Sequence, residues 1–378
     1  MKSLLQITIF VLIFGLTFSC SKEISVGPSN DEHLLEIPQQ SNTLKIAFTF
    51  ELPAASTKAL TLAAENAVIH ADVLSFRVSG QTETYDSHAG TATITDVPGS
   101  DGARKQFVVE LPRKAGNYKL VVLTNLPEEL RIKLFHISGV KTAVLNALTL
   151  TANSWQADSP APGDFMPIPM WAEVPGTVAI DDALSLSGIN DLHLLRMVSR
   201  IDVFIQPAAR NQFRLSDVYL YNRNTKGLPA PAQNAVSIGG DGHVSVTAAT
   251  VPAQSGKMLS PLIYTTPDDT ALVNSIYTLE AKGPADRNKY EDATCIVLGG
   301  YFGTDFAKTY YRVDLRDAAR NFRDLLRNHC YIFSVKAVLD RGFPTAQEAF
   351  DSTPVSISVD VLVQSWQDLT INKILEVK

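Results

Sequence analysis

Residues 44–52 read LKIAFTFEL, and their side chains alternate between apolar and polar along the whole stretch. The alternation places five large apolar side chains on one face of an extended chain. These are Leu44, Ile46, Phe48, Phe50 and Leu52. Because successive side chains of a strand point to opposite faces, this pattern predicts a β-strand with one buried face.

A second stretch of the same length lies at the other end of the chain. Residues 369–377 read LTINKILEV and place Leu369, Ile371, Leu375 and Val377 on one face, interrupted by Lys373. A strand of either stretch would cover about 30 Å at roughly 3.3 Å per residue. Two interpretations fit: both segments can occupy one hydrophobic groove in turn, or each is an ordinary edge strand of its own domain.

The connector after the first stretch favours the first interpretation. Residues 53–59, PAASTKA, are small and turn-prone, and the Lys58–Ala59 bond has the character of a site that trypsin-like proteases cut. Cleavage there would remove the first strand at a cost on the order of 10 kcal/mol, comparable with the whole stability of a domain. A strand from another subunit could refill the groove, and such head-to-tail contacts form fibres.

The rest of the chain is dominated by short alternating runs separated by turn residues. Strands are predicted at 66–79, 104–111, 117–124, 191–206, 213–221, 271–281, 293–302, 309–315, 330–339 and 355–364. This spacing predicts an all-β protein built from β-sandwiches.

Three segments have a helical pattern instead. One begins after Asn125, the second covers 141–150, and the third covers 315–327. In the third, four arginines at near-helical spacing predict a solvated face with Asp317 and Asp324 as partners, and an acidic ligand is the alternative. The four are Arg316, Arg320, Arg323 and Arg327.

The N-terminus has the pattern of an export signal. Residues 1–19 contain an apolar run too short to span a bilayer, and it ends at Cys20, which fits a lipoprotein box. We therefore expect a lipid, such as palmitate, on Cys20 and a flexible tether over 20–42. A Pro- and Gly-rich stretch followed by a polar one predicts a boundary between domains at 43–190 and 191–378.

Composition and motifs argue against nucleic-acid binding and catalysis. The 378 residues carry a net charge of −6, which lacks the basic footprint of a nucleic-acid binder. No histidine pair has zinc-site spacing, and neither a nucleophile elbow nor a phosphate loop is present. We thus expect no catalytic residues, cofactor or metal, and we interpret Gly239–Gly242 as a hairpin turn.

Cys295 and Cys330 lie in apolar, strand-like runs. Two small buried side chains are one interpretation of this pattern. A disulfide between neighbouring strands of an exported protein is the other.

Several segments together resemble the fimbrillins, the lipoprotein pilins of type V pili. In the first half these are Cys20, the first strand with its basic residue before Ala59, KLVVLTN at 119–125, and FMPIPMW at 165–171. In the second half they are LLRMVSRIDV at 194–203, YYRV at 310–313, LRNHCY at 326–331, and VDVLVQSW at 359–366 followed by a tail.

The resemblance implies two transthyretin-like β-sandwich domains with a few short helices. It also implies an outer-membrane lipoprotein precursor, removal of the first strand by a trypsin-like protease, and polymerisation with other subunits into extracellular adhesive fimbriae through the C-terminal donor strand. Better-known members are cut after arginine, whereas this chain offers Lys58. Two alternatives remain: an anchor or accessory subunit that keeps its lipid, and a monomeric surface lipoprotein that binds glycans or peptides.

Overall fold

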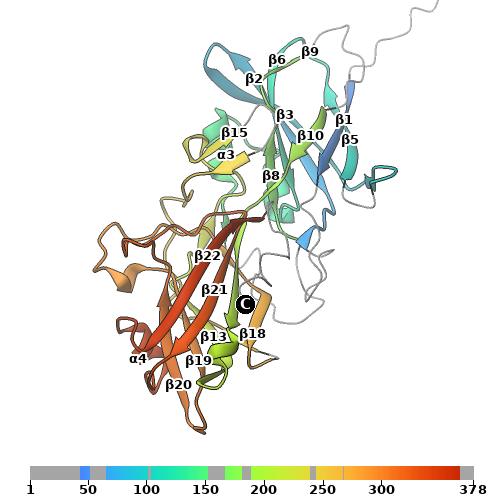
Figure 1. Ribbon diagram of the computed structural model, residues 1–378. Coiled ribbons are helices and arrows are strands. Elements are labelled where there is room, and N and C mark those ends of the chain that lie inside the picture. Colours follow the sequence, from blue (N-terminus) through green and yellow to red (C-terminus); the bar gives the residue numbers. More distant parts are fainter. Residues whose placement is uncertain are drawn as a thin grey trace, which may run out of the picture. The chain divides into compact units, whose positions relative to one another are not determined.

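A computed structural model describes residues 43–51, 65–100, 104–151, 167–180, 189–238, 244–266 and 268–366 (Figure 1). Strands make up most of this part of the chain, and its helices are short. The strands form two pairs of larger sheets and two small two-stranded pairs. The predicted all-β sandwich fold is therefore confirmed.

The first sandwich contains the first strand of the chain. One of its sheets has the order β10–β1–β5–β4. Its strands are β1 (Thr43–Glu51), β4 (Ile94–Asp96), β5 (Arg104–Pro112) and β10 (Ile189–His193). The other sheet has the order β11–β8–β6–β2–β3, and β9 also pairs with β6. Its strands are β2 (Ala71–Ser79), β3 (Thr82–Thr91), β6 (Gly116–Thr124), β8 (Met170–Glu173), β9 (Val178–Ile180) and β11 (Leu195–Arg196).

These two sheets pack face to face through one apolar core. Phe48 and Phe107 from the first sheet share this core with Phe76 and Leu120 from the second. The alternation predicted over 44–52 matches β1 closely, because every second side chain points into the core.

The second sandwich is built from the chain after Val198. One sheet has the order β18–β12–β21–β22, and the other has the order β17–β13–β19–β20. Their strands are β12 (Val198–Ile205), β13 (Phe213–Tyr221), β17 (Leu262–Thr265), β18 (Ala271–Leu279), β19 (Cys295–Phe302), β20 (Lys308–Asp314), β21 (His329–Val338) and β22 (Ile357–Ser365). A separate core, which includes Phe213, Tyr311 and Phe333, lies between them.

The pairing of strands changes between Arg196 and Val198. We predicted a single strand over 191–206, and this is wrong, because the chain there forms β10, β11 and β12. The first two pair with strands of the first sandwich and the third pairs with strands of the second. The limits of the domains near residue 190 stay a prediction.

Two short strand pairs complete the sheets. β7 (Leu150–Thr151) pairs with β14 (Lys226–Gly227), and β15 (Val236–Ile238) pairs with β16 (Val244–Val246). Ile238 lies opposite Val244 in an antiparallel register, which agrees with the hairpin predicted around Gly239–Gly242. The turn itself lies outside the described residues.

Two of the three predicted helices are present. They are α2 (Glu128–Lys133) and α3 (Lys141–Ala147), and α4 (Ala346–Phe350) was not predicted. Asn125 does not cap α2, because the residue before the helix is Pro127 and no side chain caps it. Instead Asn125 has a φ of 54° and its amide donates to the carbonyls of Ala67 (2.7 Å) and Ile168 (2.8 Å).

The helix predicted over 315–327 is absent. Arg320 has a φ of 66°, which a right-handed helix cannot accommodate. Asp317 forms a turn by accepting a hydrogen bond from the backbone of Asn321. Arg327 is fully buried and donates to Glu280, so its place on a solvated face is wrong, whereas Arg320 and Arg323 are exposed as predicted. Of the apolar residues that gave the helical spacing, Leu315 and Leu325 are buried and Ala318 is exposed.

Candidate functional site

The strand β1 lies between two other strands, as Figure 1 shows. On one side it pairs antiparallel with β5 over its whole length, from Thr43 opposite Pro112 to Glu51 opposite Arg104. On the other side it pairs parallel with β10 over a short, irregular stretch that begins where Phe48 lies opposite Ile189. The interpretation of β1 as an edge strand is therefore wrong.

The inward face of β1 is almost completely buried. Leu44, Ile46, Phe48 and Phe50 are at most 4% exposed. The Phe48 ring stacks on Phe107 with centroids 5.1 Å apart, and Phe50 meets the same ring at 6.0 Å. At about 1.5–3 kcal/mol for each buried side chain, the four contribute on the order of 6–12 kcal/mol to stability.

The geometry around β1 defines a candidate exchange site. Without β1, the facing edges of β5 and β10 would lose their partner and the apolar floor, including Phe107, would meet water. Both unpaired strand edges and exposed apolar surface favour uptake of a new strand.

A buried polar cluster forms around Glu65, Arg200, Asp202 and Tyr277. Glu65 is 1% exposed, and its carboxylate accepts hydrogen bonds from Arg200 (3.1 Å) and from the Tyr277 hydroxyl (2.5 Å). Arg200 also pairs with Asp202 at 3.1 Å. Each charge in this cluster has a partner, which is the usual condition for burying a charge.

Trp366, the last described residue, lies on the same cluster. Its ring is 4.6 Å from the guanidinium carbon of Arg196 and 5.2 Å from that of Arg200. It also stacks on Tyr277, with centroids 6.0 Å apart. Glu65, which follows the predicted cut, and Trp366, which precedes the predicted donor tail, therefore meet the same arginines.

The cluster perturbs the acid–base behaviour of its members. Burial, and after it the neighbouring Glu65 carboxylate, raise the pKa of Tyr277 well above its usual value. Burial lowers the pKa of Arg196 to about 10, because the opposing effect of the Glu65 charge offsets burial only in part. The Arg196 guanidinium donates to the Glu65 carbonyl and the Asn66 amide oxygen. For Arg200, the carboxylates of Asp202 and Glu65 outweigh burial, and its pKa is raised.

The two later cysteines are free and buried. Cys295 lies in β19 and Cys330 in β21, on different sheets of the second sandwich. Burial raises the pKa of Cys295 to about 12, and burial followed by Asp202 raises that of Cys330 well above its usual value. Of the two interpretations, the one with small buried side chains is confirmed.

Within the described residues, no three His, Cys, Asp or Glu side chains lie close enough to hold a metal ion. The same part of the chain contains no helix that is long and apolar enough to cross a membrane.

Of the residues predicted from sequence, the structure brings Leu44, Ile46, Phe48 and Phe50 together at one site. The others lie outside the described residues: Cys20, Leu52, Lys58, Ala59, Leu369, Ile371, Leu375 and Val377. Sequence reasoning missed the cluster of Glu65, Arg196, Arg200 and Trp366. The one available signal was the occurrence of two arginines and an aspartate within the apolar run at 194–203.

Comparison with known proteins decides the family. Residues 77–274, more than half of the chain, match the family described as fimbrillin-A associated anchor proteins Mfa1 and Mfa2. The chain belongs to this family. The fimbrillin resemblance seen in the sequence is thereby confirmed at the level of the family.

A curated relative of this fimbrial chain is the major fimbrium tip subunit FimE of Porphyromonas gingivalis. The two are 24% identical over 189 residues, which are 50% of this chain and 32% of FimE. The matched region thus spans about a third of the length of that relative.

Solved structures share the fold. The tip fimbrial protein Mfa3 of Porphyromonas gingivalis superposes with a TM-score of 0.51 at 14% identity, covering 85% of this chain and 100% of that one. A candidate cell adhesion protein from Bacteroides eggerthii gives 0.51 at 15% identity, covering 86% and 96%. At these identities the likeness concerns the fold alone.

Proposed function

We propose that this protein is a structural fimbrial subunit that is exported as a lipoprotein precursor and polymerised by donor-strand exchange. The observation that carries the proposal is the position of β1, an internal strand that lies between β5 and β10 and buries four apolar side chains in the core. The protease-sensitive pattern at Lys58–Ala59 follows directly after this strand. One cut there would open the site.

In this mechanism the precursor is stable because its own first strand completes the sheet. Cleavage at Lys58 would detach Leu44–Leu52 together with the lipid on Cys20. The C-terminal tail of a second subunit would then insert Leu369, Ile371, Leu375 and Val377 into the groove. Because groove and tail are different surfaces, each added subunit uses its tail and leaves its own groove free for the next subunit, and the fibre continues to grow.

The buried cluster supports this mechanism because it holds the chain next to the predicted cut and next to the predicted donor tail. Glu65 follows the predicted cut, so its ion pair with Arg200 would keep the new N-terminus in place. Trp366 precedes the predicted tail, so its contacts with Arg196 and Tyr277 would fix the root of the tail. The segments before Glu65 and after Trp366 would then be the ones that move during the exchange.

The mechanism implies a defined location and set of partners. The precursor would be held in the outer membrane by its lipid, and the mature subunit would lie in an extracellular adhesive fimbrium. Its partners would be other fimbrial subunits and a trypsin-like protease. The role is structural rather than enzymatic.

A second candidate is an accessory subunit at the anchor or tip that keeps its first strand. The description of the family as anchor proteins and the similarity to the tip subunit FimE favour it. Such a subunit would retain the lipid on Cys20 and would use its tail or its surface, but not its own groove, to join the fimbrium.

The test is limited trypsin treatment of the purified precursor, followed by N-terminal sequencing and electrophoresis in SDS. We expect a mature N-terminus at Ala59 and SDS-resistant ladders. Lys58→Ala is expected to block both, whereas Lys289→Ala, at an exposed lysine elsewhere, is expected to behave as wild type. Normal ladders from Lys58→Ala would contradict the site, and an intact lipidated chain in native fimbriae would support the accessory role.

A deletion of residues 369–378 separates the donor from the acceptor. We expect a folded monomer that does not polymerise, because the uncut first strand still fills its own groove. Unfolding of this deletion variant would show that the tail belongs to its own subunit instead, and would reject the exchange mechanism.

A further inference from the structure

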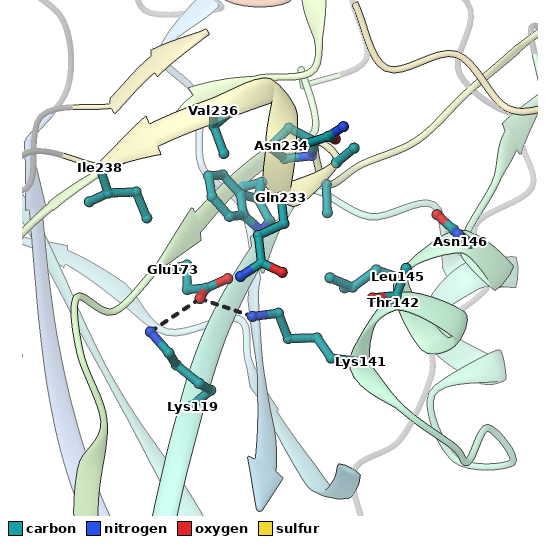
Figure 2. A pocket seen from close by; sticks show the side chains of 14 residues that line it. Lys119, Lys141, Thr142, Leu145, Asn146, Glu173, Gln233, Asn234, Val236 and Ile238 are labelled. Carbon is teal, nitrogen blue, oxygen red and sulfur yellow. Dashed lines mark hydrogen bonds and ion pairs between the residues drawn. The ribbon is translucent and has the colours of Figure 1, made fainter. Parts of the chain in front are cut away.

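A cavity of about 730 Å³ lies over the face of the sheet that contains β6 and β8. None of the residues that line it belongs to β1 or to the predicted donor tail. Lys119 of β6, Lys141 of α3 and Glu173 of β8 form its floor, and Gln233 and Asn234 approach it from the segment before β15 (Figure 2). Its size is within the range of about 300–1,000 Å³ that is typical of ligand sites.

The charges at the floor balance each other. Glu173 accepts from Lys141 at 2.9 Å and lies 3.4 Å from Lys119, and Lys141 also pairs with Glu83 at 2.6 Å. Two ammonium groups therefore face two carboxylates. A charged ligand would lose its hydration without gaining an unopposed partner, so this floor favours a neutral ligand.

The walls combine hydrogen-bonding and apolar groups. Gln233 and Asn234 are exposed, and each amide can donate and accept. The apolar side chains of Leu145, Val236 and Ile238 also line the cavity. A sugar presents the same combination, since its hydroxyls donate and accept while its C–H faces are apolar.

The sheet beneath the cavity offers no backbone edge to a peptide. β6 pairs with β2 on one side and with β8 and β9 on the other, and β8 also pairs with β11. Peptides in extended form commonly bind by adding a strand to an open edge. At this floor, recognition therefore comes from side chains and not from strand addition, which suits a compact ligand.

We propose that this cavity binds a short neutral oligosaccharide. Its hydroxyls accept hydrogen bonds from Lys119 and Lys141 and donate to Glu173. The amides of Gln233 and Asn234 bind it by hydrogen bonds from the opposite wall. This binding does not depend on strand exchange, because the monomeric precursor already contains the complete cavity.

The experiment uses the full uncut chain on an array of immobilised neutral oligosaccharides, with sulfated and sialylated oligosaccharides and short neutral peptides as separate arms. We expect binding in the neutral sugar arm. The tightest of these sugars is then titrated in solution by calorimetry. The double variant Gln233→Ala with Asn234→Ala should weaken binding at least tenfold, because it removes both amides of the wall, and circular dichroism verifies that it is folded. Gln106→Ala, at an exposed amide of β5, should bind as wild type.

Glu173→Gln tests the charge argument directly. Removing this carboxylate leaves the floor with an excess positive charge, so binding of the neutral sugar should fall while binding of sulfated sugars should rise. Circular dichroism verifies that the variant is folded. Lack of binding in the neutral sugar arm, binding unchanged in the double variant, or binding confined to the anionic or peptide arm would each overturn the proposal.

Discussion

The first and last strands of the described chain occupy opposite kinds of position. β1 lies inside its sheet, between β5 and β10, and its inward side chains are almost fully buried. β22 lies at the edge of its sheet, pairs only with β21, and has side chains that alternate between half-buried and exposed. Removing β1 would open a gap with two unpaired edges, whereas the end of β22 can continue into a tail without disturbing its sheet. The positions of β1 and β22 are therefore the ones that the proposed exchange mechanism requires of a replaceable strand and of the strand before a donor tail.

The largest effect should follow removal of β1. A chain that begins at Ala59 should lose on the order of 6–12 kcal/mol of unfolding free energy in the first sandwich, because four buried apolar side chains are lost. Urea unfolding measures this loss. A synthetic peptide of residues 369–377 should restore stability, and a peptide with Ser in place of Leu369, Ile371, Leu375 and Val377 should not. If the chain that begins at Ala59 were fully stable without any peptide, β1 would not stabilise the first sandwich, and the contrast between β1 and β22 would not hold.

Within β1, one side chain should account for much of the effect. Phe48→Ala removes a ring that is 0% exposed and stacks on Phe107, so we expect a loss of about 3–5 kcal/mol in unfolding free energy. Val108→Ala on the outward face of β5, where the side chain is 49% exposed, should cost less than about 1 kcal/mol. Equal losses in urea unfolding would mean that β1 is not packed as described.

The buried cluster can be tested by a double-mutant cycle. Glu65→Ala should destabilise the chain by about 3–5 kcal/mol, because it leaves Arg200 buried without one of its carboxylates. Adding Arg200→Ala should recover part of this loss. The exposed pair of Lys45 and Glu110 is the matched control, and its coupling should be below about 1 kcal/mol. Purely additive losses at Glu65 and Arg200 would show that the two do not interact.

The smallest effect concerns pH. Burial, and then the nearby Arg131, lower the pKa of His70, whose ring donates to the carbonyl of Leu126 at 2.9 Å. Above the usual value of about 6.5 the ring is neutral in both states and stability is complete. As pH falls below it, the unfolded chain takes up a proton that the folded chain resists, and unfolding free energy decreases.

The variant His70→Gln should therefore reduce the difference in urea midpoint between pH 7.5 and pH 5. His136→Gln, at an exposed histidine, should leave that difference unchanged. Part of the dependence should remain in His70→Gln, because burial also lowers the pKa of His88 in β3. An unchanged dependence in His70→Gln would show that this ring is not buried in the folded chain.

Regular alternation made much of the fold predictable. The patterns at 44–52 and 213–221 correspond closely to β1 and β13, because each strand has one face in a core. β3 was not predicted, since its sequence TETYDSHAGT is polar and it lies at a sheet edge with no fully buried side chain. An edge strand is stabilised by its neighbour, and its own sequence carries little of that information.

The polar cluster could not have been predicted in the same way. Glu65 and Arg200 are separated by 135 residues, and only the folded chain brings them together. Arg327 misled the sequence reasoning for a related reason, because its partner Glu280 lies 47 residues away and its burial has no local signature. The apolar face of the exchange site was predictable from local pattern, whereas the charges that hold its flanking segments were not.

The contacts of Trp366 bear on how a fibre would resist pulling. Its backbone N–H donates to the carbonyl of Asn328 at 2.8 Å, and its ring lies on Arg196, whose own guanidinium donates to the carbonyl of Glu65. Tension applied to the segment after Trp366 would thus pass from an indole to a guanidinium and on to Glu65, across side chains and not only along the ladder of β22. In the proposed fibre, part of the load on the tail would therefore be borne by this buried cluster.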